Sequence, residues 1–250
     1  MHCTKSKKEV NKVQFSCQAG YVRGLTGSVY WHPGVTPPAV AVCQRLRHSH
    51  NMTLLIARHG QTDWNRLGRW QSRSDVPLND AGRAQAKGLR DILRARELYP
   101  SRIICSPLQR AQETASLLAE DTNVQPETES LLVELNLGEF EGRFEQDIRA
   151  ADPAAYARWR ETCYLEAAPG GESILDVADR IAPFLEVLDD SAGDILVVGH
   201  QGVNMAMKAQ LSDCFSVECL MAFRQGNDEI DLWDFNPPRS IGRLRTRALA

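Results

Sequence analysis

No run of apolar residues in this chain approaches the roughly 20 residues that a membrane-spanning helix needs. Its seven cysteines show no paired zinc spacing and no credible disulfide framework, which favours a reducing compartment. With 43% hydrophobic and 24% charged residues, the composition is that of an ordinary globular protein in water. We therefore expect a cytoplasmic protein without a membrane partner, whose 250 residues suffice for one α/β domain or at most two small ones.

Acidic residues are nearly absent from the first 51 positions, which contain seven Lys or Arg and only Glu9 as an acid. Because this segment is rich in Lys, Gly, Pro and Ser and has no sustained hydrophobic period, we predict that residues 1–51 form a basic, disordered extension. An alternative is that the natural protein starts at Met52. The rest of the chain carries an excess of acids, which argues against a specific nucleic-acid partner. We predict a folded domain over residues 52–236 and a C-terminal tail over residues 237–250.

Histidine is scarce in the predicted domain, where only His59 and His200 occur. Each follows a short aliphatic run, Leu54 to Ala57 or Ile195 to Val198, and each lies beside a glycine. Such runs are typical of buried strands in a parallel sheet. Ligands of open α/β sheets bind beyond the carboxyl ends of the strands, so we expect both histidines and Arg58 to meet in one crevice. The alternative is that each histidine is only a hydrogen-bonded residue at a strand end.

Capping residues predict three helices between the strands. Asn79 and Ser173 each precede a segment whose apolar residues recur with a period of 3.6, as in an amphipathic helix. Ser106 is predicted to cap a third helix, with Pro107 in the first helical position and Gln109 completing a capping box. Strand, turn and helix therefore follow one another repeatedly along the chain.

Two further segments complete the expected architecture. Residues 152–164 are rich in aromatic and charged side chains and are expected to form a helical cover over the crevice. Residues 229–235 can supply an edge strand. The alternation of strands and helices predicts an α/β three-layer sandwich, with a mostly parallel central sheet and helices on both faces.

Two arginines indicate an anion site rather than a cation site. A guanidinium beside His59 repels a metal ion, but Arg58 is suited to binding phosphate oxygens bidentately. Arg110 lies in the first turns of the helix predicted after Ser106, where backbone N–H groups also favour anions. This set would suit phosphoryl transfer, with a neutral histidine as nucleophile and a carboxylic acid as proton donor. Spacing alone does not choose the acid among Asp63, Asp75, Glu134, Glu139 and Glu172.

Five motifs follow one another in the domain. The first is RHGQTDWNRLGRWQSRSDVPLNDAGRAQA at 58–86, the second SPLQRAQETA at 106–115, and the third ELNLGEFEG at 134–142; PGGES and VVGHQG come after them. In this order they resemble the histidine phosphatase superfamily, with its phosphoglycerate-mutase-like fold, from about Met52 to Phe235. The resemblance implies a metal-independent hydrolase that cleaves a small phosphorylated metabolite and needs no cofactor.

The resemblance also implies a role for individual residues. His59 would be the phosphorylated nucleophile and Glu134 the proton donor, while Arg58, Arg110 and His200 would bind the phosphoryl group. Three further residues would line the phosphate and substrate pocket or lie beside it, namely Asn65, Gln71 and the backbone of Gln201. The alternative for Asn65 is that it only caps the loop after the strand, and for Gln71 that it only faces solvent.

Departures from the family pattern separate its branches. Ser72 stands where the family often has Gly, which predicts a less close backbone approach there. The Gly-Trp pair and the Tyr-containing acid motif of the mutase branch are both missing, so the chain resembles the phosphatase branch, which includes α-ribazole phosphatases and broad-specificity phosphatases. Two other functions stay open, a cofactor-dependent phosphoglycerate mutase and a non-catalytic module that binds phospho-ligands. The sequence leaves the oligomeric state open, and a homodimer is compatible with it.

Overall fold

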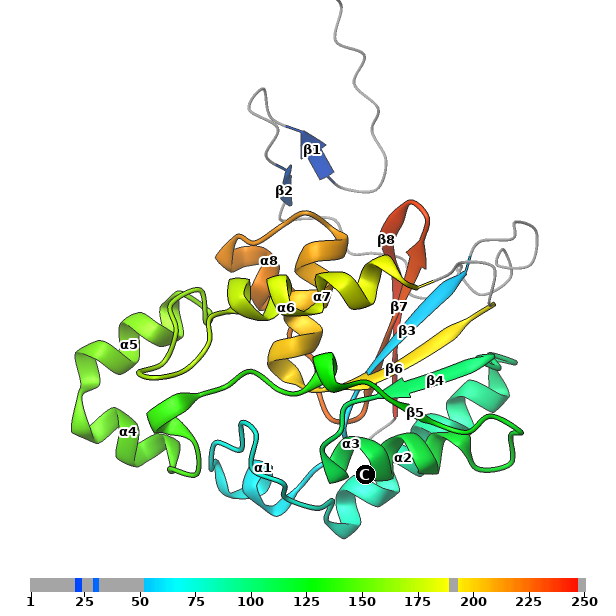
Figure 1. Cartoon of the computed structure of the whole chain (residues 1–250), viewed down its shortest axis with the longest axis horizontal. Helices are drawn as coiled ribbons and strands as arrows, with labels where there is room; N and C mark the ends of the chain where they lie inside the picture. Colours follow the sequence, from blue (N-terminus) through cyan, green and yellow to red (C-terminus); the bar gives the residue numbers. More distant parts are fainter. Residues whose placement is uncertain (1–20, 24–28, 32–51, 189–192, 247–250) are drawn as a thin grey trace, which may run out of the picture. The chain divides into compact units, whose positions relative to one another are not determined.

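A computed structural model describes residues 21–23, 29–31, 52–188 and 193–246 (Figure 1). The chain divides into two compact units, Met1–Pro38 and Ala39–Ala250. In the first unit, strands β1 (Tyr21–Arg23) and β2 (Val29–Trp31) pair antiparallel. These six residues have regular structure where we predicted none, because Tyr, Val and Trp favour strands and flank a glycine-containing segment. The rest of the predicted extension lies outside the described residues.

The second unit is built on a six-stranded sheet with the order β5-β4-β6-β3-β7-β8. Its strands are β3 (Thr53–Arg58), β4 (Arg102–Cys105), β5 (Glu127–Thr128), β6 (Ile195–Gly199), β7 (Glu229–Phe235) and β8 (Pro238–Arg245). The strands from β5 to β3 run parallel, whereas β7 and β8 are antiparallel to their neighbours. The two predicted aliphatic runs are therefore adjacent strands, with Leu54 opposite Ile195.

Helices cover both faces of this sheet, which confirms the predicted three-layer α/β architecture. Side chains alternate along a strand, so Leu54 and Ile56 of β3 enter one core cluster and Leu55 and Ala57 the other. The first cluster includes residues of α6 (Ile174–Glu186) and α7 (Gln201–Leu211). The second includes residues of α2 (Asp80–Ala95) and α3 (Gln109–Ala119), on the opposite side of the sheet in Figure 1. Both faces of β3 are buried, which explains its continuous apolar run.

The helix caps confirm two of the three predicted starts. Asn79 accepts a hydrogen bond from the Gly82 N–H at the start of α2, and Ser173 forms a capping box with Asp176 at the start of α6. The third prediction is wrong, since α3 begins at Gln109 after Leu108, without a side-chain cap. The Ser106 hydroxyl is buried and contacts His200 instead.

Two predictions about the C-terminal region are wrong. Residues 229–235 form β7, which is not an edge strand because β8 pairs with its outer side. Residues 238–245, predicted to be part of a tail, form β8. This strand is mostly exposed and has no apolar alternation, so its sequence resembles a tail. It is held by ladder pairing and by ion pairs from Arg243 and Arg245 to buried carboxylates of β7, Glu229 and Asp231.

Short helices connect the main elements and extend over one end of the sheet. They are α1 (Asp63–Leu67), η1 (Ser130–Leu132), η2 (Gly138–Phe140), α4 (Glu145–Ala151), α5 (Pro153–Glu161) and α8 (Val217–Ala222). Helices α4 and α5 lie to one side of the sheet in Figure 1, where the helical cover was predicted. Trp159 of α5 contacts the rings of Trp70, Phe140 and Tyr164 edge-on, which stabilises this cover through aromatic packing.

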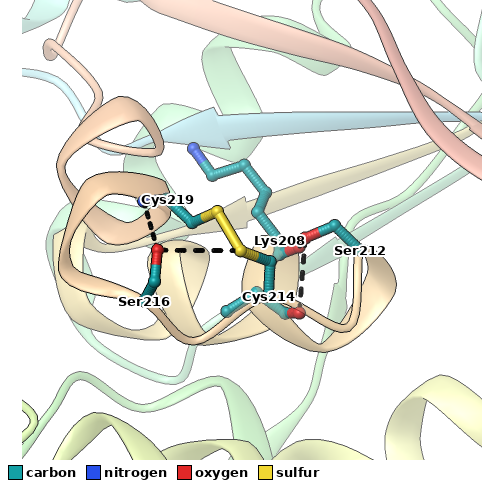
Figure 2. Close-up of a disulfide and its surroundings, with 6 residues drawn as sticks. Lys208, Ser212, Cys214, Ser216 and Cys219 are labelled. Carbon is teal, nitrogen blue, oxygen red and sulfur yellow. Dashed lines mark hydrogen bonds between the residues drawn. A yellow bond between two sulfur atoms is a disulfide. The ribbon is translucent and has the colours of Figure 1, made fainter. Parts of the chain in front are cut away.

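A disulfide joins Cys214 to Cys219 and ties the turn after α7 to α8 (Figure 2). This contradicts our expectation that the cysteines form no disulfide. The spacing of the seven cysteines did not indicate this pair. The turn before α8 brings the two Cα atoms to 6.2 Å, a distance that a disulfide can bridge. Cys105 and Cys163 are buried free thiols. Among the described helices, none is long and apolar enough to cross a membrane.

Candidate active site

The ends of β3 and β6 bring the predicted histidines together. Arg58 lies opposite Gly199 in the parallel register, and the His59 N–H donates to the Gly199 carbonyl at 3.0 Å. His200 follows directly as the N-cap of α7. The two imidazole rings are consequently 5.0 Å apart, and both are buried. Arg58, His59 and His200 therefore meet at this edge of the sheet, as predicted, and Arg58 and His59 line a cavity there.

His59 is held in one tautomer. Its Nδ1 lies 2.7 Å from the Gly60 carbonyl oxygen, and because a carbonyl only accepts, Nδ1 carries the proton. The lone pair is then on Nε2. Burial, with help from the charges of Arg110 and Arg58, lowers the pKa of His59 well below 6.5. A neutral imidazole with a basic Nε2 is the form that a nucleophile needs.

His200 lies behind His59 rather than on the cavity wall. Its Nε2 is 2.7 Å from the Ser106 hydroxyl, which also accepts from the Leu108 N–H and can therefore donate its own proton to Nε2. Burial and the charge of Arg110 lower the pKa of His200 well below 6.5. The neutral ring then carries its proton on Nδ1, which has no hydrogen-bond partner among the described residues.

Both imidazoles are expected to remain neutral at pH 6.5, where a histidine in water is half protonated. Nitrogen-15 NMR should show the neutral pattern for both rings at this pH, with the His59→Gln and His200→Gln variants assigning the signals. Below pH 6.5 these two histidines bind protons in the unfolded chain but stay neutral in the folded protein. The free energy of unfolding should therefore decrease as the pH falls through 6.5. Two imidazolium signals at pH 6.5 would contradict the buried, neutral state.

Two arginines flank the histidines. Arg110 in the first turn of α3 is buried and donates to the carbonyls of Ser72 and Ser74, each at 2.7 Å. Burial lowers its pKa to about 10, so it remains a cation at neutral pH. Arg58 donates to the Gln225 carbonyl at 3.0 Å and to Gln201 Oε1 at 3.2 Å. The Nε atoms of both arginines are buried without a partner among the described residues, which leaves donors for an anion.

Glu134 is the one of the five candidate acids that lines the same cavity. Its Oε1 accepts from the N–H groups of Leu135, Gly202 and Val203, at 2.7, 3.0 and 3.2 Å. Its Oε2 accepts only from Gly202 among the described residues, at 3.2 Å, and is thus the oxygen with more room for a proton. Arg73 donates to the Glu134 carbonyl at 3.2 Å and steadies this loop. The remaining candidates have other surroundings: Asp63, Asp75 and Glu172 hold neighbouring donors, and Glu139 is exposed.

The three outer residues all line the cavity as well. Asn65 Oδ1 accepts from the Thr62 N–H at 3.1 Å in the capping box of α1, so Asn65 caps this helix in addition to lining the cavity. Gln71 is buried rather than solvated, and its Oε1 accepts from the Thr62 hydroxyl at 2.8 Å. Gln201 joins the site through its side chain, which bonds Arg58, and not only through its backbone.

The cavity of about 310 Å³ also includes residues that sequence reasoning missed. Arg69 and Trp70 lie within the first motif beside Gln71, a position that could have suggested them. Leu137 lies within the third motif and Tyr164 within the predicted cover, whereas Glu145 of α4 and Arg224 after α8 gave no sequence signal. Ser72 has φ +49°, a conformation that favours glycine, and its hydroxyl bonds the Leu135 carbonyl at 3.0 Å and the Leu137 N–H at 2.9 Å.

The arrangement suits transfer of a phosphoryl group. A neutral, basic nitrogen lies next to two cations with spare donors, and a carboxyl group lies on the same cavity. Within the described residues, no three His, Cys, Asp or Glu side chains are grouped to hold a metal ion. Arginine side chains on the cavity wall supply positive charge for an anionic substrate.

Comparison with known proteins identifies a matching family and several similar proteins. The sequence profile of the histidine phosphatase superfamily (branch 1) matches residues 54–239. The glucosyl-3-phosphoglycerate phosphatase of Mycobacterium tuberculosis is 35% identical over 168 residues, 63% of this chain and 74% of the relative. The adenosylcobalamin/alpha-ribazole phosphatase of Salmonella typhimurium is 34% identical over 163 residues, 64% and 79% of the two chains. The solved structure of mycobacterial glucosyl-3-phosphoglycerate phosphatase with VO3 is similar with a TM-score of 0.67 and 32% identity, covering 76% of this chain and 96% of that one.

Proposed function

This chain belongs to the histidine phosphatase superfamily and is a phosphoric monoester hydrolase, and we propose that it works through a phosphohistidine at His59 with Glu134 as the proton donor. The observation that carries this proposal is the state of His59. The Gly60 carbonyl fixes the proton on Nδ1, so an unprotonated Nε2 is available next to Arg58 and Arg110. An imidazole in this state can attack phosphorus without first losing a proton.

In the first half-reaction, Nε2 of His59 attacks the phosphorus atom and forms the N–P bond. The bond from phosphorus to the leaving-group oxygen breaks, and Glu134 gives its proton to that oxygen, so an alcohol departs. Arg58 and Arg110 neutralise the oxygens of the transferring group through their unpartnered Nε–H groups. Positioning and charge neutralisation supply most of the catalysis in phosphoryl transfer.

In the second half-reaction, the Glu134 carboxylate takes a proton from a water molecule, whose oxygen attacks the phosphorus. The N–P bond breaks, phosphate leaves, and both His59 and Glu134 return to their starting protonation states. His200 does not line the cavity, but its ring packs 5.0 Å from that of His59, so its Nδ1–H, which lacks a partner among the described residues, is proposed as a donor to the phosphoryl group once this group is bonded to His59. No other group has to gain or lose a proton in the cycle.

The substrate class is a small phosphorylated metabolite. The cavity of about 310 Å³ lies at the small end of the range for ligand pockets. The relatives named above are phosphatases for glucosyl-3-phosphoglycerate and α-ribazole phosphate, which share the phosphomonoester and little else. The shared chemistry supports hydrolysis of a phosphomonoester here.

Turnover of 4-nitrophenyl phosphate is expected to continue in the presence of EDTA, because arginine side chains supply the positive charge. The measurement is 4-nitrophenolate release with and without the chelator, at matched ionic strength. Loss of activity with EDTA that added divalent metal restores would contradict the proposed mechanism.

The two alternative functions are distinguished by the fate of the phosphoryl group. We expect 3-phosphoglycerate to release inorganic phosphate rather than to isomerise. Isomerisation without release would indicate a mutase. Binding of phospho-ligands without any turnover would indicate a non-catalytic module.

A further inference from the structure

More arginines line the cavity than a phosphoryl group requires. Arg58, Arg69, Arg110 and Arg224 all contribute to its wall. Arg58 and Arg110 both depress the pKa of His59, which places them at the nucleophile's end. Their two positive charges match the charge of about −2 on a phosphomonoester. The other two arginines are in excess for this group.

Arg69 is already engaged within the protein. Its Nε donates to the Gly142 carbonyl, and its guanidinium lies 4.0 Å from the centroid of the Trp64 ring, a cation–π contact. The one acidic side chain of the cavity besides Glu134 is Glu145, which accepts a hydrogen bond from the Tyr156 hydroxyl and adds its charge to the surroundings of Arg160. Among the described residues, Glu145 forms no ion pair with Arg224.

Arg224 is the cation of this cavity that is left without a partner. Its side chain is exposed, and it forms no ion pair with any carboxylate of the described residues, unlike Arg73 and Arg180, which share Glu172. Its charge acts on both Arg58 and Tyr164, so the guanidinium lies near the phosphoryl end of the cavity and near the aromatic wall. A free arginine at this place can bind an anion that the substrate brings.

The backbone on both sides of Arg224 is fixed. The Phe223 carbonyl accepts from the buried Lys208 ammonium at 2.6 Å. Gln225 donates its N–H to Gln201 Oε1 at 3.3 Å, and its carbonyl holds Arg58 at 3.0 Å. The preceding helix α8 is tied down by the Cys214–Cys219 disulfide (Figure 2). The backbone of Arg224 is therefore held in place close to Arg58, which is proposed to bind the phosphoryl group.

Tyr164 lines the same cavity in a strained conformation. Cys163 and Tyr164 have φ angles of +51° and +72°, which side chains of this size rarely adopt. The Tyr164 ring is buried against Trp159, 5.0 Å between centroids, and its hydroxyl accepts from Arg160 at 2.7 Å. Such strain persists where the surroundings fix a functional side chain. A leaving group attached to a phosphoryl at His59 would occupy the cavity that Tyr164 and Arg224 line.

We propose that Arg224 binds a carboxylate on the leaving group, so that the preferred substrates are carboxylated phosphomonoesters. This inference rests on the proposed function, because it assumes that phosphate is released at His59. A guanidinium matches a planar carboxylate with two parallel hydrogen bonds, and the cavity of about 310 Å³ leaves room for a small acid. Arg224 thereby determines specificity and takes no part in the chemical step.

The test compares two esters that differ only at the leaving group's far end, 3-phosphoglycerate with a carboxylate and glycerol 3-phosphate with a hydroxymethyl group. Phosphate release should give a kcat/KM at least about tenfold higher for the carboxylated ester, as one charge-assisted hydrogen-bonded pair provides. The Arg224→Gln variant should reduce this ratio by about tenfold, mainly through a higher KM for 3-phosphoglycerate. Arg224→Lys keeps the positive charge but cannot form two parallel hydrogen bonds, so it should retain part of the preference for 3-phosphoglycerate.

Arg158→Gln is the matched control, because Arg158 is an exposed arginine of α5 that does not line the cavity. It should leave the ratio as in the wild type. Inhibition by inorganic phosphate, which occupies only the phosphoryl end, should persist in Arg224→Gln. Equal kcat/KM for both esters in the wild type, or equal losses for both in Arg224→Gln, would overturn this inference while hydrolysis stands. No release from these esters or from 4-nitrophenyl phosphate would instead overturn the proposed function.

Discussion

The His59→Ala variant is expected to release phosphate at least about 10⁴-fold more slowly than the wild type, the scale of loss when a nucleophile is removed. The substitution removes Nε2, whereas Arg58 and Arg110 remain to bind the substrate. The measurement is kcat with saturating 4-nitrophenyl phosphate. Quenched turnover of a phosphorus-32 ester should also leave an acid-labile label on the wild type and none on the variant.

The loss has to be separated from a failure to fold, because His59 is buried beside a second imidazole. Inorganic phosphate should still raise the melting temperature of His59→Ala, since the arginines that bind it are intact. The His59→Gln variant fills more of the ring's volume and should be equally inactive. Turnover within tenfold of the wild type in a folded variant would place the nucleophile elsewhere.

The Glu134→Gln variant should separate good from poor leaving groups. An amide cannot supply the proton, so kcat/KM for an alkyl phosphate, which reports formation of the phosphohistidine and not its hydrolysis, should fall by about 10²–10⁴-fold, the usual contribution of a general acid. For 4-nitrophenyl phosphate, whose leaving group departs without protonation, we expect kcat/KM to fall by less than about tenfold. The glutamine oxygen can still accept from the Gly202 and Val203 N–H groups, so the fold of the loop is preserved.

Glu139→Gln is the matched control for this comparison. Glu139 belongs to the same acid motif but its side chain is exposed and does not line the cavity. It should hydrolyse both esters at wild-type rates. If Glu134→Gln lowered kcat/KM for both esters by the same factor, Glu134 would hold the start of α7 and would not be the acid.

Strands β3 and β6 were predictable because a strand that is buried on both faces has a continuous apolar sequence. Leu54 to Ala57 and Ile195 to Val198 are continuous aliphatic runs, and only the interior strands of a parallel sheet combine that pattern with a polar residue at the carboxyl end. His59 and His200 then lie side by side through register alone. The acid could not be chosen this way, since Glu134 reaches the cavity from a loop without a period.

The errors share a physical cause, which is that the deciding partner is distant in the chain. Ser106 has the ideal sequence context for a helix cap, yet its hydroxyl contacts His200, 94 positions away. The strand β8 has no apolar alternation because carboxylates of β7 pair with its arginines. The Cys214–Cys219 disulfide depends on a turn that brings the two residues together.

By itself, the sequence determined the architecture, the meeting of Arg58, His59 and His200, and the membership of the family, because strand periodicity and motif order are local properties of the chain. Only the tertiary structure decided which ring nitrogen of His59 is free, since that depends on the Gly60 carbonyl and on burial. It also decided that Arg224 lines the cavity without an ion pair to any carboxylate of the described residues. Protonation and electrostatic partnership depend on the distances between groups, and these exist only after the chain has folded.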